Sequence, residues 1–69
     1  MIKIYALNVS EEILNKFKDF EVRAYYDNFN TLPIVYIVED EELKFVINEA
    51  DYGRINACIL KLRRREKGT

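Results

Sequence analysis

The chain has 69 residues, a length that predicts one domain over residues 1–69. Apolar residues make up 49% of it and charged residues 33%, which is typical of a folded domain and excludes a disordered one. The single cysteine excludes an intrachain disulfide, and without histidine there is no set of four Cys or His ligands for structural zinc. We therefore expect no metal and no cofactor, and a small core supported by tight packing or self-association.

The net charge of −1 hides an asymmetry along the chain. Residues 1–60 carry six basic and eleven acidic residues, a balance of −5, whereas residues 61–69 carry five basic residues and one acidic residue, a balance of +4. The longest apolar run, residues 34–38, is far shorter than the roughly 20 residues of a membrane-spanning helix. Residues 1–9 lack the long apolar region of a signal peptide. We expect a cytoplasmic protein with an acidic body and a basic C-terminal end.

Residues 2–9 are rich in β-branched and aromatic types and predict a strand. Apolar side chains fall on both of its faces, which is typical of a central strand covered on both sides. Ser10 is the expected N-cap of a helix that runs to about Phe20, although Asn8 has the alternative capping-box spacing. The helix carries an apolar stripe, which consists of Ile13, Leu14, Phe17 and Phe20.

Residues 21–29 predict a second strand, which alternates between two partly apolar faces. A turn is expected over residues 30–33, where Pro33 cannot donate to a ladder and therefore marks an edge or the start of a strand. Residues 34–38 form the clearest strand of the chain, because they are apolar and mostly β-branched.

Residues 43–48 fit two structures. As a helix they form an apolar stripe that Asp40 would cap, and as a strand they alternate between two faces. We favour the strand because Phe45, Val46 and Ile47 are strongly β-prone. Residues 34–48 are then a hairpin with the acidic residues at its tip.

The last predicted element is a helix from about Asp51 or Gly53 to Lys67, with Gly68 as its C′ residue. Its buried stripe consists of Ile55, Cys58, Ile59 and Leu62. The element order is therefore β-α-β-β-β-α. We predict a small two-layer α+β sandwich in which two helices pack on a mixed sheet of three or four strands.

Residues that could perform catalysis are scarce. The chain has no histidine to act as a base near neutral pH, and its two glycines do not form a phosphate-binding loop. Cys58 is a candidate nucleophile, but its place between Ile55 and Ile59 on the inward side of a helix predicts a buried core thiol. We do not expect an enzyme.

The acidic run of residues 39–42 is the first charged cluster. A calcium loop needs roughly six to eight oxygens at varied depth and a glycine for its turn. Four consecutive acids at a hairpin tip do not offer that cage. We interpret the run as a solvated turn, with contact to a basic partner protein as the alternative.

The second charged cluster consists of Lys61, Arg63, Arg64, Arg65 and Lys67. Cations at the end of a helix offset its dipole, which is our first interpretation. Contact with nucleic-acid phosphates and docking on an acidic protein surface are the alternatives. The acidic body would repel a duplex lying across it.

The strand alternation predicts a sheet with two apolar faces. The helices are expected to cover Ile2, Ile4, Val22, Ala24, Tyr26, Ile34, Tyr36, Val38, Leu43, Phe45 and Ile47. This leaves a second set, which comprises Tyr5, Leu7, Tyr25, Phe29, Val35, Ile37 and Val46. Monomers rarely expose such a row, and aromatic residues with a polar rim mark an interface core. Either the helices cover both faces, or a face is assigned wrongly, or the second set binds another copy or a different protein.

These patterns predict a small non-enzymatic protein-interaction module, which acts as a regulator, adaptor or inhibitor by occupying a partner's surface, with a homodimer as one option. The expected contacts are Tyr5, Leu7, Tyr25, Phe29, Val35, Ile37, Glu39, Asp40, Glu41 and Glu42. The alternative is a nucleic-acid-binding regulator that uses Lys61, Arg63, Arg64, Arg65 and Lys67. No membrane contact is expected.

Overall fold

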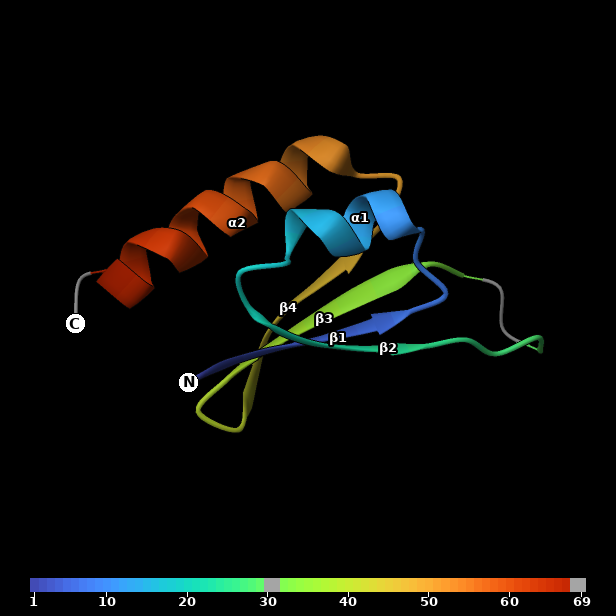
Figure 1. Cartoon of the computed structure of the whole chain (residues 1–69), viewed down its shortest axis with the longest axis horizontal. Helices are drawn as coiled ribbons and strands as arrows, with labels where there is room; N and C mark the ends of the chain where they lie inside the picture. The colour runs from blue at the N-terminus through green and yellow to red at the C-terminus, as the bar shows by residue number, and fades with distance from the viewer. Residues whose placement is uncertain (30–31, 68–69) are drawn as a thin grey trace.

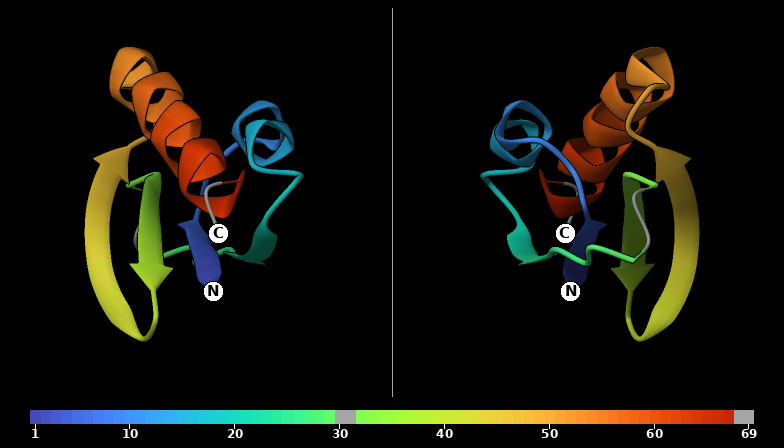
Figure 2. Two further views of the ribbon diagram at one scale, coloured as in Figure 1. Left: turned by 90° about the vertical axis from the view of Figure 1, so that its left-hand side faces the viewer. Right: turned by 90° about the vertical axis from the view of Figure 1, so that its right-hand side faces the viewer.

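Two helices lie on one face of a four-stranded mixed sheet (Figure 1 and Figure 2). The computed structural model describes residues 1–29 and 32–67. In chain order its elements are β1 (Ile2–Leu7), α1 (Glu11–Lys16), β2 (Glu21–Tyr25), β3 (Ile34–Glu39), β4 (Glu42–Asn48) and α2 (Tyr52–Lys67). The strand order is β2-β1-β3-β4, with β1 parallel to β2 and antiparallel to β3. The predicted element order and α+β class are confirmed.

β1 is a central strand, as its apolar faces predicted. Ile2, Ile4 and Ala6 are buried beneath the helices. Tyr5 and Leu7 alternate with them on the opposite face and are half-buried. Both helices lie on the side of Ile4, so the expected cover on both faces of the strand is wrong (Figure 2).

Ser10 is the N-cap of α1. Its Oγ accepts a hydrogen bond from the Ile13 backbone N–H at 3.4 Å. Asn8, the alternative cap, instead has φ 54°, a left-handed conformation that asparagine tolerates. The Asn8 side chain accepts a hydrogen bond from the Asp27 backbone N–H at 2.8 Å, and it therefore ties the end of β1 to the segment after β2.

α1 was expected to reach Phe20 but ends at Lys16. The chain continues with shorter-range hydrogen bonds, from the Phe17 N–H to the Leu14 oxygen at 3.1 Å and from the Phe20 N–H to the Phe17 oxygen at 2.9 Å. Bonds from residue i to i−3 wind the chain more tightly than an α-helix. Phe17 and Phe20 are nevertheless buried, so the predicted apolar stripe reaches the core.

β2 was expected to reach Phe29 but ends at Tyr25. The Asp27 N–H donates to the Asn8 side chain, and the Phe29 N–H donates to Asp27 Oδ1 at 2.9 Å. Such side-chain bonds offer the backbone an alternative to the ladder and bend the chain out of the sheet. Of the turn predicted over residues 30–33, residues 30 and 31 lie outside the described part of the chain.

β3 and β4 form the predicted hairpin, so residues 43–48 are strand. Asp40 and Glu41 connect the two strands with φ values of 51° and 66°. Positive φ at both central residues is typical of a type I′ turn, whose twist matches that of the hairpin. A bulge at Lys44 shifts the register of β4 by one residue near this turn.

Asp51 caps α2. Its Oδ1 accepts a hydrogen bond from the Arg54 N–H at 3.3 Å, and its backbone oxygen accepts one from the Ile55 N–H at 3.0 Å. The predicted Gly68 terminus and the Lys67 side chain lie outside the part that the structure describes. No helix within the described ranges has the length and apolar character needed to cross a membrane.

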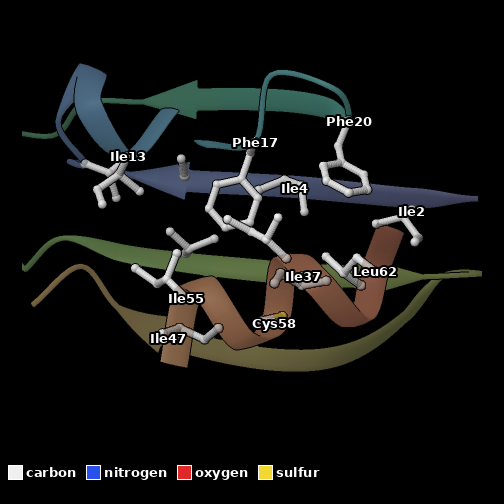
Figure 3. Close-up of a cluster of buried hydrophobic side chains, with 14 residues drawn as sticks. Ile2, Ile4, Ile13, Phe17, Phe20, Ile37, Ile47, Ile55, Cys58 and Leu62 are labelled. Atoms are coloured by element: carbon white, nitrogen blue, oxygen red, sulfur yellow. The ribbon is translucent and has the colours of Figure 1, made fainter. Parts of the chain in front are cut away.

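The core fills the space between the helices and the sheet (Figure 3). Its side chains point inward from β1, β3, β4, α1 and α2 and from the turns beside α1. They are Ile2, Ile4, Ala6, Val9, Ile13, Phe17, Phe20, Val35, Ile37, Ile47, Ile55, Cys58, Ile59 and Leu62. The predicted stripe of α2 is therefore confirmed.

β3 faces the opposite way from the sequence prediction. Val35 and Ile37 were expected on the second apolar face, yet both are fully buried beneath the helices. Opposite residues of a ladder share a face, and Ile37 lies opposite Ile4. Because side chains alternate with a period of two, this register turns the whole strand over. The residues that face away from the helices are Ile34, Tyr36 and Val38.

Leu43 and Tyr26 were also expected beneath the helices. The bulge in β4 places Leu43 opposite Val38, so Leu43 faces away from them. Tyr26 lies beyond the end of β2, where it is 66% exposed and its hydroxyl donates to the Val9 oxygen at 3.3 Å. Both departures arise where the regular alternation of a strand is interrupted.

Ile37→Ala should lower the free energy of unfolding by about 2–5 kcal/mol, because it removes a fully buried side chain and leaves a cavity. Val46→Ala is the matched control on the other face and should cost about 1 kcal/mol or less, since Val46 is 44% exposed. Urea unfolding followed by circular dichroism measures both. Equal losses would contradict the orientation of β3.

Candidate functional site: the uncovered face of the sheet

The side of the sheet away from the helices carries three rows of side chains, each with one residue from every strand. Residues that lie opposite each other share a face, so the ladder pairings fix the rows. In the order β2, β1, β3, β4 the rows are Tyr25, Leu7, Ile34, Asn48; Arg23, Tyr5, Tyr36, Val46; and Glu21, Lys3, Val38, Leu43. We call these residues the open face.

Most of the open face is apolar or aromatic. Tyr5 lies directly opposite Tyr36, which places two half-buried rings side by side on the central strands. Towards the edges, Tyr25, Leu43 and Val46 are 52%, 55% and 44% exposed. Neither helix covers this surface (Figure 2). Large contiguous apolar patches of this kind mark interaction sites on proteins.

The charged side chains of the open face gather at one corner. Lys3 lies opposite Glu21, and Arg23 lies opposite Tyr5 in the next row. Among open-face residues these are the charged ones, and they belong to β2 and the adjacent end of β1. An apolar, aromatic centre with a polar rim has the composition of a protein interface.

A hollow of about 620 Å³ indents the open face at its hairpin end. It is lined by Met1, Lys3, Tyr5, Val38, Asp40 and Glu41. Asp40 Oδ1 lies 2.9 Å from the N-terminal ammonium, whose hydrogen bond and charge lower the pKa of Asp40 from its usual value. The hollow therefore combines an apolar wall with charged groups of both signs.

The acidic run contributes unequally to this surface. Glu39 points toward the helices, where its Oε1 lies 2.8 Å from Arg65 Nη1, and its side chain is 18% exposed. Glu42 pairs with Lys44 at 3.3 Å. Of the predicted acidic contacts, Asp40 and Glu41 line the hollow, while Glu39 stabilises the packing of the tip against α2.

Phe29 was expected on the same face as Tyr25, but it lies outside the rows because β2 ends before it. Phe29 is fully exposed at 100% and Leu32 is 58% exposed, so both apolar side chains project from the connection between β2 and β3. This connection lies at the end of the sheet opposite the hairpin tip.

The basic cluster on α2 is divided between paired and unpaired residues. Arg63 Nη2 lies 3.2 Å from Asp19 Oδ2, and Arg65 pairs with Glu39. Lys61 and Arg64 make no ion pair with the side chains of residues 1–29 and 32–65. The helix end is therefore partly engaged by the chain's own acids.

The open face joins residues that the sequence identified with residues that it missed. Tyr5, Leu7, Tyr25 and Val46 lie there as predicted, whereas Val35 and Ile37 lie in the core. The missed members are Ile34, Tyr36, Val38 and Leu43. β3 gives no signal of its orientation, because an apolar strand fits the core equally well either way, and Leu43 was missed because of the bulge in β4.

Cys58 does not provide a reactive group. The thiol is buried, and burial raises its pKa above the usual 9.0, against the opposing charges of Lys61 and Arg54. A thiolate is the nucleophilic form, so burial suppresses its chemistry. In the described part of the chain, His, Cys, Asp and Glu do not form a group of three or more that could hold a metal ion.

No protein-family model, curated protein or solved structure matches this chain. Inference about function therefore depends on the geometry and chemistry of its surfaces.

Cys58 in the folded protein should react with a maleimide at pH 7.5 at least about tenfold more slowly than in the urea-unfolded chain, because burial and a raised thiol pKa both oppose thiolate formation. Mass spectrometry of timed samples measures both rates. Rapid labelling of the folded protein would show an accessible, activated thiol.

Proposed function

We propose that this protein is a small cytoplasmic, non-enzymatic interaction module. It acts as a regulator, adaptor or inhibitor by covering part of a partner protein's surface with its open face. The observation that carries the proposal is a four-stranded sheet with both helices on one side and an apolar, aromatic face on the other (Figure 2). Tyr5 and Tyr36 form the centre of the contact, because aromatic residues at the centre of an interface contribute most to binding.

The area of the open face limits how large an interface it can form. Four strands at about 4.8 Å spacing and five or six residues at about 3.3 Å each give a surface of about 350 Å² in projection. A standard interface buries about 800 Å² of accessible surface per partner. The open face therefore suits a small interface of moderate affinity, which Phe29 and Leu32 can enlarge at one end.

The side chains of the open face indicate which kinds of side chain a partner surface must carry. The centre requires an apolar patch, and the charged corner of Lys3, Glu21 and Arg23 requires polar residues on the same side of that patch. The hollow suits a side chain that is apolar along its length and polar at its end, because an apolar wall of Tyr5 and Val38 adjoins charged groups of both signs.

A second copy of the chain fits this face poorly in an aligned packing. With the two-fold axis along the strands, β2 lies over β4, so Arg23 and Glu21 meet Val46 and Leu43. With the axis across the strands, β2 lies over β2, and Arg23 meets Arg23 of the second copy. Both arrangements remove charges from water without a partner of opposite sign. We therefore favour a different protein over a homodimer.

The protein should have the mass of one chain at tens of micromolar in size-exclusion chromatography with light scattering, because aligned self-packing buries unpaired charge. A dimer that Val46→Glu converts to a monomer would instead make a second copy the occupant of the open face. A raised 260/280 nm absorbance ratio with excess mass would favour nucleic acid, stacked on the paired tyrosines.

Tyr36→Glu and Val46→Glu should each abolish capture of a partner from a lysate of the source cells, because both place a charge within the apolar face. Lys18→Glu is the control, since Lys18 is exposed in the segment between α1 and β2. Quantitative mass spectrometry should find proteins retained by the wild-type and Lys18→Glu baits and lost from both open-face variants, all four being folded by circular dichroism.

Titration calorimetry with the purified partner should then give a negative heat-capacity change and little dependence on salt, as burial of apolar surface requires. Capture that persists in both open-face variants would exclude the open face as the contact. Binding that weakens steeply with salt would point instead to a phosphate backbone.

A further inference from the structure

A second hollow lies on the helix side of the molecule, between the C-terminal half of α2 and β4. It is lined by Phe45, Lys61, Leu62, Arg64 and Arg65 and has a volume of about 390 Å³. That volume falls within the roughly 300–1,000 Å³ of typical ligand sites. Its residues come from two consecutive elements, which the fold brings into contact, so the hollow exists only in the folded chain.

The floor of this hollow is apolar. Leu62 belongs to the core and is 1% exposed. Phe45 lies opposite Ile37 on the helix side of the sheet and packs against the core, but it remains half-buried because β4 is an edge strand. An aromatic ring at such an edge offers a surface on which a further apolar side chain can pack.

The rim of the hollow is cationic. Lys61, Arg64 and Arg65 occupy positions i, i+3 and i+4 of α2, which places them on neighbouring turns of one side of the helix. The ion pair of Arg65 with Glu39 at 2.8 Å fixes one end of the rim. Among the side chains of residues 1–29 and 32–65, Lys61 and Arg64 have no acidic partner beside the apolar floor.

The helix dipole does not account for the whole rim. Its effect falls off within the last turn, which suits Arg64 and Arg65. Lys61 lies six residues before the end of α2 at Lys67 and is beyond that range. Lys61, Arg64 and Arg65 together surround an apolar floor. This combination indicates a ligand that carries both negative charge and an apolar group.

We infer that this hollow binds an acidic segment of a partner protein, with an apolar side chain of the segment on Phe45 and its carboxylates against Lys61 and Arg64. The guanidinium of Arg64 can bind a carboxylate through two parallel hydrogen bonds, and Lys61 supplies a point charge. The inference goes beyond the proposed function of the open face and does not depend on it, because the two surfaces lie on opposite sides of the sheet.

The surrounding charges favour an acidic peptide over a nucleic acid. Nucleic-acid binding typically draws on roughly six to ten phosphate contacts, whereas the rim consists of Lys61, Arg64 and Arg65, of which Arg65 is paired with Glu39. The hairpin tip next to Glu39 also carries Asp40 and Glu41, which repel an extended polyanion. A short segment with two carboxylates meets the rim without crossing the tip.

Fluorescence anisotropy tests the inference with a fluorescein-labelled twelve-residue peptide of repeated Glu-Glu-Leu-Phe. It should bind, and Lys61→Glu with Arg64→Glu should weaken it at least about tenfold. Lys18→Glu with Arg54→Glu is the matched control, because it changes the net charge by the same amount and neither residue lines this hollow or belongs to the open face. The control should weaken binding by no more than about twofold.

Two further probes separate the contributions of charge and apolar contact. Replacing Glu by Gln, or Leu and Phe by Gly, should each abolish detectable binding of the peptide. Phe45→Leu, which keeps the core filled, should weaken the original peptide severalfold. Absence of peptide binding, equal losses in the two double variants, or tighter binding of a labelled deoxythymidine oligonucleotide than of the peptide would overturn the inference.

Discussion

The pairing of β1 with β3 is the constraint on which the rest of the molecule depends. It places Ile4 opposite Ile37 and Tyr5 opposite Tyr36. The first pair joins the core beneath the helices, and the second forms the centre of the open face. A shift of one residue would exchange the two sets, because strand side chains alternate with a period of two. Core and surface are thus fixed by the same register.

The two helices reinforce the difference between the two faces, because both of them cover the same side of the sheet. α1 follows β1 and leads into the parallel strand β2, and α2 returns over the sheet after the hairpin, so both pack on one side (Figure 1). The small core is completed there by apolar side chains from both layers. The apolar residues left on the other side have no cover within the described chain, and they support an interaction role.

The charges follow the same division into two sides. Glu39, an odd-numbered residue of β3, points toward α2 and holds Arg65, whereas Asp40 turns toward the open face. The acidic tip and the basic helix end therefore meet within one chain. This neutralises part of both clusters, and it leaves the paired tyrosines on one side and the rim of Lys61 and Arg64 on the other as distinct surfaces.

The sequence by itself determined the type and order of the elements, since capping at Ser10, the apolar stripe of α2 and the β-prone hairpin are local signals. It did not determine where α1 and β2 end, because bonds formed in the folded chain end both elements early. It also marked Tyr5, Leu7 and Tyr25 as members of a second apolar face. The tertiary structure alone decided the orientation of β3, because a strand that is apolar on both faces carries no local information about which face meets the core. Register with β1 and the cover of the helices supply that information only when the chain is folded.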